Sequence, residues 1–260
     1  MKFIDFHTHI YPDAIAEKAT RSVCNFYQLK SNLNATAETL LNIGKESGID
    51  KFVLLPVALK PDSVCHINDF ISKKASEHSE FIGFGTLHAG MENPLEEIER
   101  IKSLGLHGIK IHPDTQQFSI DDERLYPVYD ALQGNMPILI HCGDPRYDYS
   151  HPKHLKKILH MFPKLTVIAA HLGGWSMFET AFSYLKDENC YFDISSSMMF
   201  LNVAKLKEYI FGYGTDRILF GSDFPLWNPA SEKDTFLNLN ISLEDKEKIA
   251  YKNAERILNL

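Results

Sequence analysis

Short apolar stretches recur along the whole chain, and several are continuously apolar rather than alternating with polar residues. Phe52-Val-Leu-Leu-Pro-Val, Ile138-Leu-Ile and Val167-Ile-Ala-Ala are examples. Runs of this kind are typical of parallel strands that are buried on both faces. The pattern predicts eight strands: Lys2–His7, Lys51–Val57, Phe81–Leu87, Gly108–His112, Pro137–His141, Leu165–His171, Cys190–Ile194 and Arg217–Ser222.

Segments with helical patterns separate these runs. Asn93 and Pro94 supply an N-cap and a first helical residue, and an apolar stripe extends from Leu95 to Leu104. Ser242 and Asp245 resemble a capping box at the start of the last helix. Further helices are predicted at Ala14–Tyr27, Ser72–Ser79, Leu125–Gln133, His154–Met161, Met177–Lys186 and Val203–Phe211.

Eight strands alternating with helices in 260 residues match the size of a (β/α)₈ TIM barrel, which has about 250 residues. An open doubly wound sheet is the alternative, but the chain has no glycine-rich dinucleotide loop. No repeat or linker divides the chain, so we predict a single domain over residues 1–260. Two segments, Ile10–Asn34 and Phe224–Asn240, are longer than a barrel needs, and we expect both at the rim formed by the carboxyl ends of the strands.

The composition is that of an ordinary globular protein, with 44% hydrophobic and 23% charged residues and a formal net charge of −7. No run of five Lys or Arg residues occurs, which disfavours a nucleic-acid partner. The four cysteines form no CxxC pair and are expected to be reduced thiols. No apolar stretch approaches the roughly 18 residues of a membrane span, and the first residues do not resemble a signal peptide. We therefore expect a cytoplasmic protein.

Five candidate site residues stand at the ends of predicted strands. His7 and His9 end the first, His141 the fifth and His171 the sixth, and Asp223 follows the eighth. A spacing of two places His7 and His9 on the same face of their strand, toward the barrel axis. Because the carboxyl ends of barrel strands meet at one rim, these side chains should converge. Imidazoles with a carboxylate suit Zn²⁺ or a similar divalent ion, which makes a bound water acidic at neutral pH.

These residues stand in motifs that resemble the amidohydrolase superfamily. The motifs are Asp5-Phe-His-Thr-His9, Ile140-His-Cys-Gly143, Ala169-Ala-His-Leu-Gly-Gly174, Phe220-Gly-Ser-Asp-Phe-Pro225 and Asn253-Ala-Glu-Arg-Ile-Leu258. More narrowly, they resemble its amidohydrolase-2 branch, which contains hydrolases, lactonases and metal-dependent non-oxidative decarboxylases such as aminocarboxymuconate semialdehyde decarboxylase. The resemblance implies a metal held by His7, His9, His141 and Asp223, with one ion favoured over two and Zn²⁺ as the expected metal.

The resemblance also implies roles for two further side chains. In mononuclear members the histidine on strand 6, here His171, orients or deprotonates the metal-bound water, so His171 and Asp223 are the expected proton carriers. In binuclear members a carboxylated lysine on strand 4 bridges two metals. Lys110, within Gly108-Ile-Lys-Ile-His-Pro113, stands at the matching place. The alternative is that Lys110 pairs with a carboxylate at the rim.

Five residues are candidates for substrate contact. His88 and His112 end predicted strands, although solvated loop positions would explain both. Arg146, followed by Tyr147, can clamp a substrate carboxylate because guanidinium groups bind carboxylates in a bidentate manner, with a surface ion pair as the alternative. Trp227 either forms a wall of the pocket or packs beneath its loop.

The leading hypothesis is a metal-dependent hydrolase that attacks an amide, lactone or ester of a small polar substrate. The alternative is a metal-dependent non-oxidative decarboxylase of a carboxylated enol or aromatic compound, which would use the same metal site. TatD-type deoxyribonucleases fit less well, because their strand-4 Gly-Glu motif is replaced by Gly-Ile-Lys and the net charge is negative. A non-catalytic barrel is disfavoured because all principal site positions are filled. We expect a small-molecule substrate and neither a nucleic-acid partner nor membrane association. A homodimer is one assembly that such a barrel can form.

Overall fold

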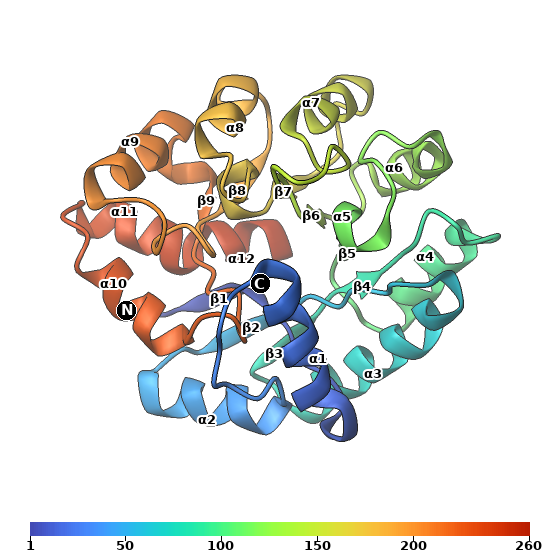
Figure 1. The fold of residues 1–260 in the computed structure, drawn as a ribbon, viewed down its shortest axis with the longest axis horizontal. Coiled ribbons are helices and arrows are strands. Elements are labelled where there is room, and N and C mark those ends of the chain that lie inside the picture. Colours follow the sequence, from blue (N-terminus) through green and yellow to red (C-terminus); the bar gives the residue numbers. More distant parts are fainter.

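The computed structural model describes all 260 residues, and its strands form a closed parallel barrel (Figure 1). Each predicted strand overlaps an observed one, but the third is interrupted at Phe84 and counts as two, β3 and β4. The strands are β1 Ile4–Thr8, β2 Lys51–Leu54, β3 Phe81–Gly83, β4 Gly85–Thr86, β5 Ile109–Ile111, β6 Ile138–Ile140, β7 Val167–Ala169, β8 Tyr191–Asp193 and β9 Ile218–Leu219. The predicted (β/α)₈ barrel is therefore confirmed.

Backbone hydrogen bonds join the sheet β1-β2-β3 to the sheet β4 to β9 at both edges. The Phe84 amide donates to the Leu54 carbonyl at 3.0 Å, which joins the two parts of the interrupted strand to β2. The Phe6 amide donates to the Phe220 carbonyl at 2.9 Å, which links β1 to the segment after β9. These two contacts close the barrel without a free edge.

Helices surround the strands as a ring in Figure 1. They are α1 Asp13–Tyr27, α2 Ala37–Ser47, α3 Val64–Glu77, α4 Pro94–Ser103, α5 Pro113–Gln116, α6 Tyr126–Leu132, α7 Pro152–Met161, α8 Phe178–Leu185, α9 Val203–Tyr213, α10 Pro229–Leu237, α11 Leu243–Glu247 and α12 Asn253–Leu258. The sequence pattern missed α2, α10 and the short α5, and it placed the start of α3 at Ser72 rather than Val64. Ser242 caps α11 as predicted, because its side chain accepts from the Asp245 amide, whereas the Asn93 side chain makes no capping bond.

Two hydrophobic clusters lie on opposite faces of the strands. The larger one fills the layer between strands and helices and includes Ile109 and Ile111 of β5. The smaller one consists of alternate strand residues, such as Leu139 and Ile168, together with apolar residues of α12. It is the barrel interior, and α12 closes its amino-terminal end. Lys110 pairs in register with Leu139, so its side chain points into the barrel.

The loops that follow β6 and β7 meet backbone to backbone at Gly143. A Cβ atom there would lie 2.5 Å from the Gly174 Cα, and Gly143 has a φ of +76°. The Trp175 amide donates to the Cys142 carbonyl at 2.7 Å in the same place. The contact therefore requires glycine, and it fixes the loops that begin at His141 and His171.

We expect Gly143→Ala to lower the free energy of unfolding by about 2–4 kcal/mol, because the methyl group both strains a left-handed backbone and collides with a neighbouring backbone. Gly134→Ala is the matched control, since Gly134 has a φ of +68° but no atom within 4 Å of the added methyl. It should cost only about 1–2 kcal/mol. Urea titrations of both variants measure the difference, and equal losses would show that the loop contact is unimportant.

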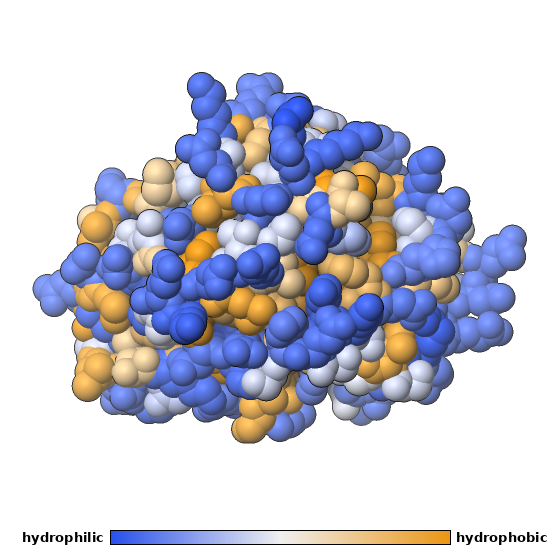
Figure 2. Space-filling model, turned by 90° about the horizontal axis from the view of Figure 1, so that it is seen from below, coloured by the Kyte–Doolittle hydropathy of each residue, from blue (hydrophilic) through white to orange (hydrophobic).

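No helix combines the length and the apolar character that crossing a lipid bilayer requires. On the face drawn in Figure 2, polar side chains predominate and apolar ones form small patches between them. The expected homodimer stays a prediction.

Candidate functional site

A cavity of about 600 Å³ opens at the carboxyl ends of the strands. Buried polar side chains line its inner part, and more exposed, mainly apolar or aromatic ones line its outer part. The polar group comprises His7, His9, Lys110, His112, Asp114, His141, His171 and Asp223. Helix α1, which reaches toward the centre of the ring in Figure 1, contributes Ala19, Ser22, Val23, Phe26 and Tyr27. Such a combination suits a small ligand with an apolar body and a polar end.

His7, His9 and Asp223 direct three electron pairs at one point. The Nδ1 of His9 lies 2.6 Å from the Leu55 carbonyl, which can only accept, so this nitrogen carries the proton and Nε2 carries a lone pair. The Nδ1 of His7 likewise donates to the Asp193 carboxylate at 2.9 Å. The two Nε2 atoms lie 3.6 Å (His7) and 3.2 Å (His9) from Oδ1 of Asp223. Three acceptors with no proton between them fit a divalent cation.

A β-bulge in β1 helps to position the first histidine. Asp5 pairs with Phe52 and Thr8 with Leu54, so β1 uses one residue more than β2 over this stretch. Bulges of this kind redirect a side chain and often adjoin active sites. The Thr8 side chain donates to the Val53 carbonyl, while His7 and His9 both line the cavity, as the sequence spacing predicts.

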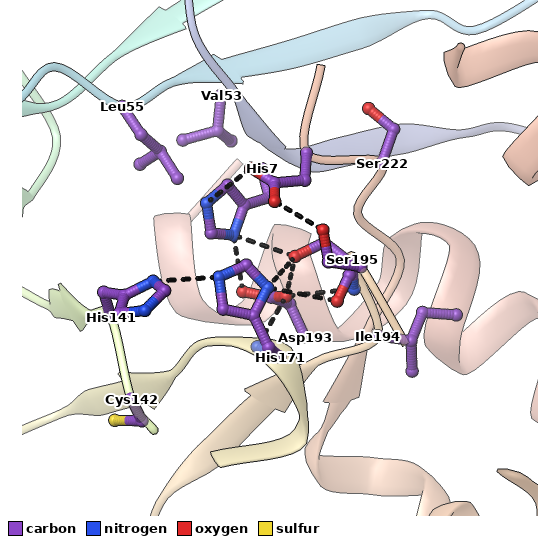
Figure 3. Close-up of polar contacts among 12 residues, drawn as sticks. His7, Val53, Leu55, His141, Cys142, His171, Asp193, Ile194, Ser195 and Ser222 are labelled. Atoms are coloured by element: carbon purple, nitrogen blue, oxygen red, sulfur yellow. Dashed lines mark hydrogen bonds and ion pairs between the residues drawn. The ribbon is translucent and has the colours of Figure 1, made fainter. Parts of the chain in front are cut away.

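His141 and His171 are held in a fixed hydrogen-bond chain (Figure 3). The Ser195 hydroxyl donates to Asp193 at 2.5 Å, so its oxygen can only accept from Nδ1 of His171, at 2.9 Å. Nε2 of His171 then accepts from Nδ1 of His141 at 3.1 Å. This order leaves a lone pair on Nε2 of His141, a buried atom without any partner.

The structure therefore brings together only three of the four predicted metal ligands. Ligand atoms of His7, His9 and Asp223 lie within 4.8 Å of one another. His141 lies outside this group and instead forms a second one with His112 and Asp114. Its ring stacks on that of His112 with centroids 3.8 Å apart, and its Nε2 is 3.7 Å from Asp114.

The charge states of the site follow from burial and from its ion pairs. Burial alone would raise the pKa of Asp223, but the neighbouring imidazoles of His7 and His9 outweigh it and hold the pKa well below the ordinary value. Burial is likewise outweighed at Asp193, where His7 lowers the pKa to about 2. Burial lowers the pKa of His171 to about 4 and that of His141 far below its usual value. At neutral pH both carboxyl groups are thus ionised and both imidazoles are neutral, the forms that bind metals.

Two site residues adopt a backbone conformation that L-amino acids rarely use. The φ angle is +56° at His171 and +66° at Asp223. Asp223 is supported there by backbone bonds, since its amide donates to the His7 carbonyl at 2.8 Å. Left-handed residues of this kind are often found at functional sites, where the surrounding structure compensates for their strain.

Lys110 of β5 lines the same cavity and is entirely buried. Its Nζ atom has no hydrogen-bond partner, and burial lowers its pKa to about 8. The alternative of an ion pair at the rim is therefore wrong. Nearby, the Tyr27 hydroxyl lies 2.6 Å from Nε2 of His112, which places both of these side chains in the wall of the cavity.

Comparison with known proteins identifies the barrel. Residues 4–260 match the sequence model of the amidohydrolase family. The chain belongs to this family. The chain is 22% identical over 299 residues to the gamma-resorcylate decarboxylase of Polaromonas sp. strain JS666, with 90% of each chain covered.

Two solved structures share the fold of the amidohydrolase. One is an uncharacterised TIM-barrel protein of Bordetella bronchiseptica, with a TM-score of 0.81 and 23% identity over 100% of this chain and 99% of the other. The second is a dihydroxybenzoic acid decarboxylase of Polaromonas sp. JS666, with bound manganese and the inhibitor 2-nitroresorcinol. Its TM-score is 0.79, with 20% identity over 100% of this chain and 97% of that chain.

Three of the proposed substrate contacts lie elsewhere in the amidohydrolase. Arg146 is held by the fully buried Asp144, with Nε–Oδ1 at 2.9 Å and Nη2–Oδ2 at 2.6 Å, because a buried carboxylate needs a cationic partner. Trp227 donates to the Ser196 hydroxyl, which in turn donates to Asp223, so the indole supports Asp223 from behind. His88 accepts from the Gly90 amide in a turn. None of the three predicted residues lines the cavity.

The other two proposed contacts do line it. Tyr147 belongs to the outer wall, where its ring stacks with that of Phe26 at 5.9 Å, and His112 belongs to the inner wall.

Two important site residues were not predicted from the sequence. Asp193 ends the buried strand β8, so the search for polar residues at strand ends could have found it. Tyr27 ends α1; the segment Ile10–Asn34 was expected at this rim, but nothing in the sequence singles out Tyr27 within it.

A second pair of buried carboxyl groups lies behind the site. Asp5 accepts from the amides of His7 and Ser222 through Oδ1, while its Oδ2 has no partner. Burial raises the pKa of Asp5 to about 7. Glu232 of α10 also has an unpartnered oxygen, and burial, together with the charges of Asp5 and Asp223, raises its pKa to about 8.

Glu232 should make the protein less stable as the pH rises. Between its ordinary pKa of 4.5 and about 8, the folded state keeps a proton that the unfolded chain has released. The free energy of unfolding therefore falls through this window. We expect Glu232→Gln to remove this fall and to be more stable than the wild type at pH 8 by about 2–4 kcal/mol. Denaturant titrations between pH 5 and 9 measure the free energy of unfolding of both proteins. Glu38→Gln, at an exposed position, is the control for the loss of one charge. Parallel pH profiles of wild type and Glu232→Gln would contradict the expectation.

Proposed function

We propose that this amidohydrolase is a metal-dependent decarboxylase of a small aromatic carboxylic acid. The observation that carries the proposal is the match, over 90% of both lengths, to a gamma-resorcylate decarboxylase. A cavity with aromatic and apolar outer walls supports it, because such walls suit a benzene ring. The proposal favours the alternative of the sequence analysis over its leading hypothesis of hydrolysis.

We assign His7, His9 and Asp223 as the metal ligands, with His141 as the fourth. The hydrogen bonds to Leu55, Asp193 and His171 support the assignment, because they leave a lone pair on Nε2 of each of the three histidines. When bound, a divalent ion supplies Lewis acidity that polarises the oxygens of the acid. The ligand types in the sequence predicted Zn²⁺, whereas the related decarboxylase structure contains manganese, so we propose Mn²⁺ as the first metal to test.

Loss of CO₂ from an aromatic acid leaves a pair of electrons on the ring carbon, and a proton must take its place. The products are CO₂ and the ring compound with one hydrogen in place of the carboxylate. Among the groups that face the cavity, His171 and Asp223 are our candidates for handling that proton. The bond that His171 donates to Ser195 and the one that it accepts from His141 orient its ring, and the side chains of α1 restrict access of water.

A substrate panel tests the proposal. The manganese-loaded protein is incubated with 2,6-dihydroxybenzoate and 2-hydroxybenzoate, and in parallel with simple lactones, amides and esters. We expect CO₂ and the corresponding phenol in equal amounts from at least one acid, and no product from the second set. Hydrolysis of a lactone, amide or ester without release of CO₂ from any acid would contradict the proposal and favour the hydrolase hypothesis.

A further inference from the structure

The inner wall of the cavity contains a single basic side chain of the lysine or arginine type. Of the 21 residues that line the cavity, Lys110 is the only lysine or arginine, since Arg146 is bound to Asp144 outside it. The carboxylates that line the cavity with it, Asp114 and Asp223, are engaged by other partners. Asp114 accepts from the Ser150 hydroxyl at 2.5 Å, and Asp223 faces His7 and His9.

The position of Lys110 makes this isolation unusual. It lies on β5 between Ile109 and Ile111, whose side chains pack in the outer layer. The Lys110 side chain points the opposite way, in register with Thr86 on one side and Leu139 on the other. Its ammonium group is thus buried within the barrel, borders the cavity, and has no hydrogen-bond partner. A buried charge without a partner is costly, and an anion that enters the cavity would offset the cost.

We propose that Lys110 is the subsite for an anionic group of the ligand, and that it makes the cavity selective for carboxylates over neutral rings. This inference rests on the proposed function only in taking that anion to be the carboxylate of the substrate. The ammonium group would donate to a carboxylate oxygen, and the ring would extend toward the apolar side chains of α1. In this role Lys110 stays a cation, which differs from the anionic, carboxylated metal bridge considered from the sequence.

Calorimetric binding of benzoate and phenol to the manganese-loaded protein tests the inference. The two probes share a ring and differ in charge. We expect Lys110→Met to weaken benzoate binding about tenfold or more, which corresponds to one lost charge-assisted hydrogen bond, and to leave phenol binding within twofold. Lys157→Met, which removes an exposed lysine of α7, is the matched control and should bind both probes as the wild type does.

Several results would overturn the inference. Unchanged benzoate binding would do so, and so would an equal loss for benzoate and phenol, which would indicate a change of cavity shape. Loss of bound manganese in Lys110→Met would assign the lysine to the metal instead. If Lys110→Met does not fold, Lys110→Gln replaces it in the same comparison. Because no turnover is needed, a protein that binds benzoate through Lys110 but releases CO₂ from no acid would refute only the proposed function.

Discussion

Asp223→Asn is expected to lose at least about 10³-fold in the rate of CO₂ release, together with most of its bound metal. The carboxylate faces Nε2 of both His7 and His9, and an amide in its place offers a neutral, weaker ligand. A metal ion at such a site contributes several kcal/mol to lowering the barrier, which corresponds to a factor of this size. The measurement is the initial rate with an active aromatic acid, alongside the metal content of the purified variant.

The effect of Asp223→Asn has to be separated from a general loss of charge or of folding. Asp148→Asn removes a carboxylate from an exposed loop and should keep full activity and metal content. The left-handed backbone at residue 223 favours asparagine as the replacement, because asparagine tolerates positive φ. An Asp223→Asn variant that retains both its metal and its rate would remove Asp223 from the ligand set.

His171→Asn should show the second largest effect, but of a different kind. We expect the turnover rate to fall about 10²–10⁴-fold while the metal content stays near that of the wild type, because His171 is assigned to the proton and not to the metal. Its Nε2 already accepts from His141 and its Nδ1 contacts Ser195, so neither nitrogen is free to bind an ion. Loss of metal in parallel with activity would show that His171 is a ligand.

The sequence predicted the strand-end histidines for a physical reason. In a parallel barrel, every strand ends at the same rim, so a polar residue directly after a buried strand faces the same region as its counterparts. His7, His9, His141, His171 and Asp223 all lie at or shortly after the carboxyl ends of their strands, and all of them line the cavity. The eight strands were predictable for the same reason, because burial on both faces requires continuous apolar runs.

Residues outside the strands were harder to place. The pattern around Arg146 does not show which anion the guanidinium meets, and the nearest one proved to be Asp144, two residues earlier in the chain. Tyr27 reaches the cavity because α1 is held by contacts distant in sequence, such as the bond from Arg146 to the Phe26 carbonyl. The hydrogen bonds that set the proton positions of the histidines also depend on such contacts, since Asp193 and His7 are 186 residues apart.

The most direct test of the account measures CO₂ release from an aromatic acid by protein stripped of metal and titrated with Mn²⁺. The ligand atoms of His7, His9 and Asp223 lie within 4.8 Å of one another and are assigned to the metal, so we expect no CO₂ before metal is added. The rate should then rise linearly up to about one equivalent of Mn²⁺ and stay constant thereafter. CO₂ release at the full rate by the metal-free protein would contradict the account. So would hydrolysis of a lactone or amide by a protein that releases no CO₂ at any metal concentration.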